Sequence, residues 1–169
     1  MPLTHFNEQG DAHMVDVSQK TPTHRVATAV SRVTMKPETL KLMIEGKAAK
    51  GDVLGVARLA GIMAAKKTAD LIPLCHPIPI HSVDIDLKAD EKESCVDVRG
   101  VVTTDWKTGV EMDALTAVTV AGLTVYDMLK SVDKDMVISD IMVIEKSGGK
   151  SGHYLRTGEK SSHNESPRV

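Results

Sequence analysis

The stretch 108–132, TGVEMDALTAVTVAGLTVYDMLKSV, carries the strongest structural pattern in the chain. Its start, Thr108-x-x-Glu111, is typical of a capping box, in which two side chains satisfy free backbone N–H groups. We therefore expect a helix that opens here and runs to about Val132. Apolar residues lie almost all round this helix, which predicts burial on several sides.

The segments on either side of this helix predict a sheet and two more helices. Alternating apolar and polar residues predict four strands, 25–35, 83–87, 96–99 and 136–145, of which the middle two form a hairpin. Pro37 suits the first turn of one helix, and Asp52 can cap the next. Three prolines within 70–79 exclude a helix there. The order of elements predicts an α+β fold, a ferredoxin-like sandwich with helices packed on one face of an antiparallel sheet.

The chain divides into three parts on this interpretation. Residues 1–24 form an extended N-terminal arm, residues 25–146 form one α+β catalytic domain, and residues 147–169 form a loop rich in Gly, Ser and Lys with a flexible tail. Aromatic residues make up only 2% of the chain. Association of subunits is one way for such a chain to bury more apolar surface.

Composition excludes several classes of protein. The net charge of −2 offers no basic excess for binding nucleic acid. No apolar run approaches the roughly 18 residues that a membrane span needs. The two cysteines, Cys75 and Cys95, have no metal-site spacing, and we expect reduced thiols in a cytoplasmic protein.

Several positions could carry chemistry, and each has a structural alternative. Pro73 and Pro77 fix the backbone around His76, although a single His is more often a packed structural residue. Glu111 and Asp113 stand at the start of the long helix, where acidic residues also favour the helix dipole.

Three further charged residues are candidates for acid–base chemistry. Asp127 and Lys130 are three residues apart and share a helix face. They could form an acid–base pair in which the lysine pKa is shifted, or an ordinary exposed ion pair near the helix end. Lys50 precedes a glycine and a helix start, where anions bind, but a lone lysine there is usually solvated.

The run 146–152, KSGGKSG, resembles the end of a phosphate-binding P-loop. The first glycine of that motif would fall on position 144, which is Ile144. Only 19 residues follow Lys150, too few for a helix and a further parallel strand. We therefore exclude a P-loop NTPase, although Lys146 and Lys150 on a glycine loop could still hold a phosphate.

The length of the long helix separates two of the candidates. Asp113 and Asp127 would lie about 21 Å apart along a continuous helix, on nearly the same face. They cannot both touch one small reacting centre. Either the ligand is long, or a second copy of the chain supplies part of each site.

An ordered set of motifs resembles one family, the cyclic pyranopterin monophosphate synthases, or MoaC family. The motifs are HMVDVS at 13–18, KGDV at 50–53, LIPLCHP at 71–77, KTGVEM at 107–112, YDM at 126–128, KDMV at 134–137 and KSGGKSG at 146–152. Each alone is weak, but LIPLCHP, TGVEM and KSGGKSG in this order are specific. The similarity covers about residues 4–153.

The resemblance implies a reaction. Its substrate is the 3′,8-cyclised dihydroguanosine triphosphate derived from GTP, which is converted to cyclic pyranopterin monophosphate with release of pyrophosphate in molybdenum cofactor biosynthesis. The resemblance also implies a hexamer, built as a trimer of dimers with sites at the dimer interface. It implies no cofactor and no bound metal.

The resemblance further implies a role for each matched residue. Lys50, Asp127 and Lys130 are the expected catalytic groups. The expected substrate-binding residues are Leu74, Cys75, His76, Glu111, Met112, Asp113, Lys146, Lys150 and Asp16. Position 113 is Asp where the family usually has Glu. The competing interpretation is a non-catalytic nucleotide- or pterin-binding module on the same fold.

Overall fold

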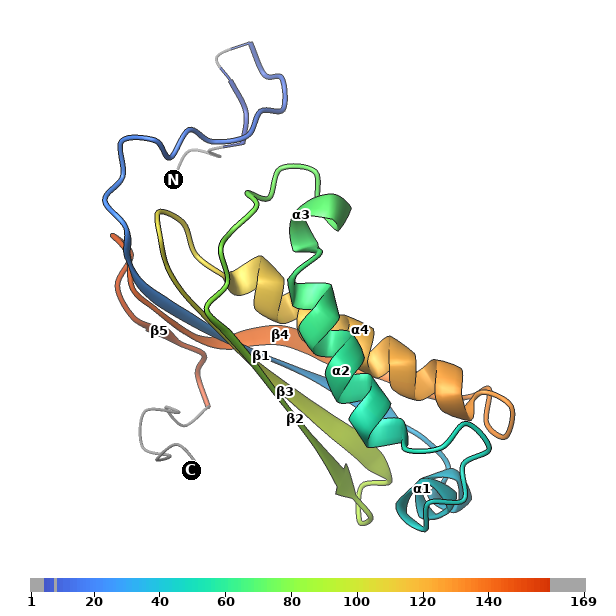
Figure 1. Ribbon diagram of the computed structural model, residues 1–169. Helices are drawn as coiled ribbons and strands as arrows, with labels where there is room; N and C mark the ends of the chain where they lie inside the picture. The colour runs from blue at the N-terminus through green and yellow to red at the C-terminus, as the bar shows by residue number, and fades with distance from the viewer. Residues whose placement is uncertain (1–4, 8, 159–169) are drawn as a thin grey trace.

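The computed structural model describes residues 5–7 and 9–158 and contains a five-stranded antiparallel sheet with helices on one face (Figure 1). The strand order is β2-β3-β1-β4-β5. The strands are β1 (Thr23–Thr34), β2 (Ser82–Asp90), β3 (Cys95–Trp106), β4 (Val137–Ser147) and β5 (Tyr154–Leu155). The helices are α1 (Pro37–Ile44), α2 (Val53–Ala65), α3 (Thr68–Leu71) and α4 (Glu111–Leu129).

The core lies between the sheet and the layer formed by α2 and α4. Small residues let these layers approach closely: a Cβ atom added to Gly100 of β3 would lie 2.9 Å from a Val118 methyl carbon. The Ser31 hydroxyl of β1 donates to the carbonyl of Val118, at 2.9 Å. Large aliphatic side chains such as Val33, Ile85 and Leu129 are almost fully buried. The α+β, ferredoxin-like prediction is therefore confirmed.

The predicted strands and first two helices are also confirmed. Pro37 stands in the first turn of α1. The Asp52 carboxylate accepts a hydrogen bond from the Gly55 N–H at 2.9 Å, as an N-cap does. β2 and β3 pair as an antiparallel hairpin, and each extends further than predicted.

The predicted capping box is wrong. α4 begins at Glu111, its N-cap is Val110, and no side chain caps it. The Glu111 carboxylate folds back against Gly109, where an added Cβ atom would lie 2.0 Å from the nearest Glu111 oxygen. The helix ends at Leu129, three residues before the predicted Val132, with Lys130 as its C-cap.

One other prediction needs correction. Residues 70–71 belong to the short helix α3, because the first proline stands at position 73 and restricts only the residue before it. By length and composition alone α4 could cross a membrane, but half of that stretch is buried inside the protein, as in the core helix of a folded domain. The loop predicted from residue 147 leads into β5, while the predicted tail beyond 158 lies outside the described residues.

Candidate functional site

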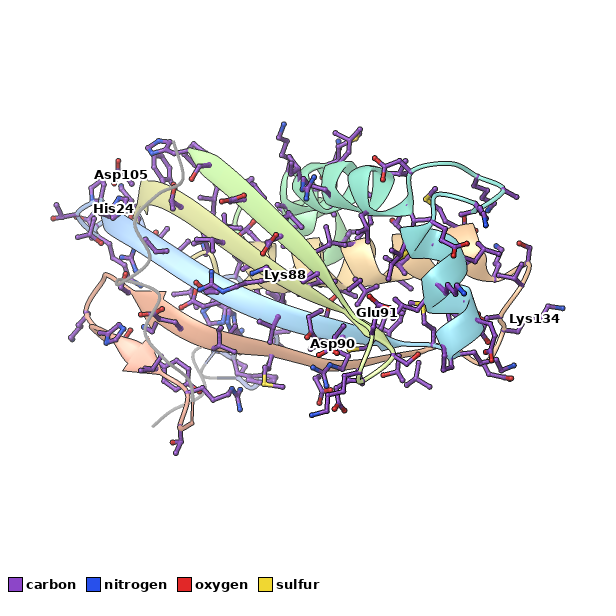
Figure 2. All side chains as sticks on the ribbon, turned by 90° about the horizontal axis from the view of Figure 1, so that it is seen from below. His24, Lys88, Asp90, Glu91, Asp105 and Lys134 are labelled. Atoms are coloured by element: carbon purple, nitrogen blue, oxygen red, sulfur yellow. The ribbon has the colours of Figure 1, made fainter. Side chains whose placement is uncertain are left out.

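The expected site residues gather at the two ends of α4, which lies across one face of the sheet (Figure 1). Figure 2 shows the two ends of the sheet: His24 and Asp105 lie at one, and Asp90, Glu91 and Lys134 lie towards the other. The two ends of α4, a helix of 19 residues, lie about 27 Å apart.

The C-terminal end of α4 carries a cluster of Lys50, Asp127 and Lys130. The Lys50 ammonium lies 2.8 Å from Asp127 Oδ2 and 2.9 Å from the Asp127 backbone oxygen. The Lys130 ammonium lies 2.5 Å from Asp127 Oδ1. These side chains are 46–56% exposed, so the cluster is open to solvent. One carboxylate thus holds two ammonium groups in place where a ligand can reach them.

The electrostatics of this cluster follow from the two cations. Hydrogen bonds from Lys130 first and Lys50 second lower the pKa of Asp127 to about 2. The same contact with Asp127 raises the pKa of Lys130. Asp127 is therefore an anion at neutral pH, and Lys130 is a firmly protonated cation that can stabilise negative charge.

Lys50 reaches this cluster from a turn between α1 and α2. Gly51 has a φ of 89°, a left-handed conformation that favours glycine, and its N–H donates to the carbonyl of Ala48 at 3.0 Å. The sequence suggested that Lys50 binds anions through the start of α2. Instead, the turn directs Lys50 onto the last turn of α4, 77 residues away.

The N-terminal end of α4 carries the buried carboxyl group of Asp113. Asp113 is 3% exposed, and within the described residues its Oδ2 has no hydrogen-bond partner. Burial raises the pKa of Asp113 to about 6. Burial and then the charge of Asp113 raise the pKa of the half-buried Cys75 thiol, so the two groups share one environment. Leu74 and Met112 are their chain neighbours.

We predict that Asp113→Asn changes how stability depends on pH. Because the folded pKa of about 6 lies above the ordinary 3.8, ionising the wild-type carboxyl group costs stability progressively as pH rises from about 4 to about 6. The full cost is up to about 3 kcal/mol above that window. The free energy of unfolding in urea, measured for both proteins, should therefore favour the Asn variant more at pH 8 than at pH 4. An equal difference at both pH values would show that Asp113 titrates normally.

The N-terminal arm also lies at this end. His76 Nε2 is 2.7 Å from the carbonyl oxygen of Val15, and the Lys107 ammonium is 2.6 Å from that of Ser18. Between them, the Asp16 carboxylate accepts the Ser18 N–H at 2.8 Å, and this bond lowers the pKa of Asp16. The structure thus brings Asp16 and His76 together from opposite sides of a 60-residue stretch of sequence.

The glycine loop completes the N-terminal end. Lys146 of β4 lies opposite Ala27 of β1, and its ammonium donates to the Ser151 hydroxyl. A Cβ atom added to Gly149 would lie 2.2 Å from the Arg25 guanidinium, so the loop packs directly on that side chain. Lys150 is exposed on the same loop.

Arg25 and Lys107 are basic residues that the sequence did not single out. Arg25 Nε donates to the carbonyl of Trp106 at 2.8 Å, and its Nη2 donates to that of Lys107 at 3.2 Å. We call Arg25, Lys107 and Lys146 the basic rim. Lys107 could have been found from its place in the KTGVEM motif, but Arg25 is hidden in an ordinary strand pattern. Within residues 5–7 and 9–158, no group of three His, Cys, Asp or Glu side chains is arranged to hold a metal ion.

Comparison with known proteins identifies the family to which this arrangement belongs. Residues 14–149 match the model of the MoaC family. The chain belongs to the MoaC family. The match spans both ends of α4 and the arm from Met14 onward.

Relatives in the MoaC family are similar over nearly their whole length. A cyclic pyranopterin monophosphate synthase of Thermomicrobium roseum is 58% identical over 161 residues, covering 95% of this chain and 97% of the relative. That of Heliobacterium modesticaldum is 60% identical, covering 92% of this chain and 98% of the relative. That of Cereibacter sphaeroides is 61% identical, covering 90% and 96%.

Proposed function

We propose that this protein acts as a cyclic pyranopterin monophosphate synthase in molybdenum cofactor biosynthesis. It converts 3′,8-cyclised dihydroguanosine triphosphate to cyclic pyranopterin monophosphate and releases pyrophosphate, as a phosphorus–oxygen lyase. The observation that carries the proposal is the Lys50–Asp127–Lys130 cluster, which unites two matched motifs 77 residues apart. The names of the MoaC relatives support the same reaction.

The two ends of α4 suit different parts of this chemistry. Ring opening and reclosure build up charge on nitrogen and oxygen, and the two ammonium groups of the cluster, held by the anionic Asp127, would stabilise that charge. Departure of pyrophosphate needs cations where negative charge develops, and the basic rim supplies three. The half-buried loop 74–76 and Asp113 supply an apolar wall with a carboxyl group for the ring system. We assign the protein to the cytoplasm, where Cys75 and Cys95, both free thiols here, stay reduced.

A complete site then needs two copies of the chain, since α4 holds its two ends apart. The outer face of the helix layer exposes apolar side chains of both helices, namely Val56, Leu59 and Met63 of α2 and Leu123 of α4. Two copies that pack these faces about a two-fold axis across α4 would bring opposite ends of their helices together. Each pair would then form two identical sites. We propose that three such pairs form a hexamer.

We predict an oligomer in dilute solution, because exposed apolar groups on a helix layer are stabilised by burial against a second copy. Light scattering at micromolar concentration should give a mass several times 18.2 kDa. Leu59→Glu should lower that mass by placing a charge in the interface. Ile44→Glu, an exposed apolar position on α1 outside the helix layer, is the matched control. A wild-type mass near 18.2 kDa would contradict the shared site.

The direct test of the proposed function is turnover. Purified protein should convert the cyclised triphosphate and release one pyrophosphate for each pterin product, measured by chromatography and a coupled pyrophosphate assay. Tight binding of the substrate without any turnover would favour the alternative, a non-catalytic nucleotide- or pterin-binding module.

A further inference from the structure

The His76 ring is held by the backbone of the N-terminal arm. Its Nε2 lies 2.7 Å from the carbonyl oxygen of Val15. A carbonyl oxygen can only accept a hydrogen bond, so Nε2 carries a proton in this contact. The ring is half-buried, and Pro73 and Pro77 restrict the backbone on either side of it. The contact therefore fixes both the orientation of the ring and the position of its proton.

The other ring nitrogen is left as an acceptor. A neutral imidazole carries one proton, so a ring protonated on Nε2 presents a lone pair on Nδ1. In the part of the chain that the structure describes, no hydrogen bond to Nδ1 is found. The charged groups facing this part of the site are Asp16 from the arm, Lys107 from the loop before α4 and Asp113 from α4.

The arm has a second point of attachment, which keeps Val15 in place. The Lys107 ammonium donates to the carbonyl of Ser18 at 2.6 Å. Inside the arm, the Ser18 N–H bonds the Asp16 carboxylate and the Lys20 N–H bonds the carbonyl of Val17. The arm is thus tied to two different loops of the site, one through His76 and one through Lys107.

We propose that the arm is a positioning element for His76: the Val15 carbonyl holds the proton on Nε2, so that Nδ1 accepts a hydrogen bond from a donor N–H or O–H of the substrate. The two ring nitrogens thus have different roles. Nε2 anchors the arm, and Nδ1 contacts the ligand. The second half of this proposal rests on the proposed function, while the first half concerns the protein alone.

The protonation state of His76 is measured by nitrogen-15 NMR of histidine-labelled full-length protein at pH 8, with the His76 signals assigned by their loss in His76→Gln. The expected result is a protonated, pyrrole-type signal for Nε2 and an unprotonated, pyridine-type signal for Nδ1. The reverse assignment, or rapid averaging between the two forms, would overturn the proposal.

Two variants separate the roles of the two nitrogens. In His76→Gln the longer side chain places an amide donor near the position of Nε2, so it can still bind the Val15 carbonyl but offers nothing at Nδ1. In His76→Asn the shorter side chain places an amide near Nδ1 and cannot reach Val15. His81→Gln is the matched control, because His81 faces Asp105 at 3.3 Å instead of the arm.

Hydrogen exchange and kinetics are then read together. For His76→Gln we expect wild-type protection of the Ser18 and Lys20 amides and a loss of about tenfold or more in kcat/KM. For His76→Asn we expect faster exchange of these amides and a rise in KM that exceeds the loss in kcat. Unchanged exchange in both variants, or wild-type kcat/KM in His76→Gln, would overturn the proposal. If the wild-type protein turns over no substrate, the proposed function fails, and the NMR and exchange results still decide whether the arm fixes His76.

Discussion

Replacing Lys50 by Ala is expected to reduce turnover by about 1,000-fold or more while the protein stays folded. Lys50 donates to both the carboxylate and the backbone oxygen of Asp127, so its removal leaves one ammonium group in a cluster built around two. Stability should change little, because both partners of this ion pair are exposed to solvent, which screens their attraction. Turnover measures the first effect, and urea unfolding measures the second.

Two further variants separate charge from proton transfer. Lys47→Ala is the matched control: Lys47 lies in the same connection between α1 and α2 but pairs with Glu45 at 2.7 Å, so its loss should leave turnover unchanged. Lys50→Arg keeps the positive charge on a group that does not release its proton near neutral pH. Substantial recovery in Lys50→Arg would assign Lys50 a purely electrostatic role. Near-normal turnover in Lys50→Ala would show that Lys50 is an ordinary solvated surface residue.

Much of the fold was predictable because its signals are local. The alternation in β2 and β3, Pro37 at the start of α1 and the Asp52 cap each depend on a few neighbouring residues. The capping box failed although its motif was present. Glu111 turned out to be the first residue of α4 and folds over Gly109, so the pattern alone did not determine where the helix begins.

The candidate site was harder to predict because its contacts cross the chain. Asp127 and Lys130 share one turn of helix, so their contact follows from spacing. Lys50 joins them only through the path of the chain between α1 and α2, which no local pattern encodes. Arg25 was equally hard to predict, because the glycine loop that packs on its guanidinium lies more than 120 residues later in the chain.

The separation of the two ends of α4, by contrast, follows from helix geometry alone. A continuous helix fixes the distance between Asp113 and Asp127 once its two limits are known, and α4 is continuous from Glu111 to Leu129. The structure also shows which residues lie at each end of α4. Lys50 belongs with Asp127 in one half of the proposed site, and His76 belongs with Asp113 in the other.

Mixed oligomers therefore test whether each site joins opposite ends of two chains. One inactive variant carries His76→Ala, and the other carries Asp127→Ala. In a mixed dimer, one site receives both intact halves and the other receives both lesions. At equal mixing about half of the dimers are mixed, so activity should return to about a quarter of wild type. Lys50→Ala combined with Asp127→Ala is the internal control, since both lesions damage the same half.

The decisive measurement is turnover by co-expressed, differently tagged subunits after purification through both tags, which confirms that the oligomers are mixed. Our account predicts substantial activity for the His76→Ala and Asp127→Ala pair and none for the Lys50→Ala and Asp127→Ala pair. If verified mixed oligomers of the first pair remain as inactive as their parents, both groups belong to one chain's site, and the two-chain active site is wrong.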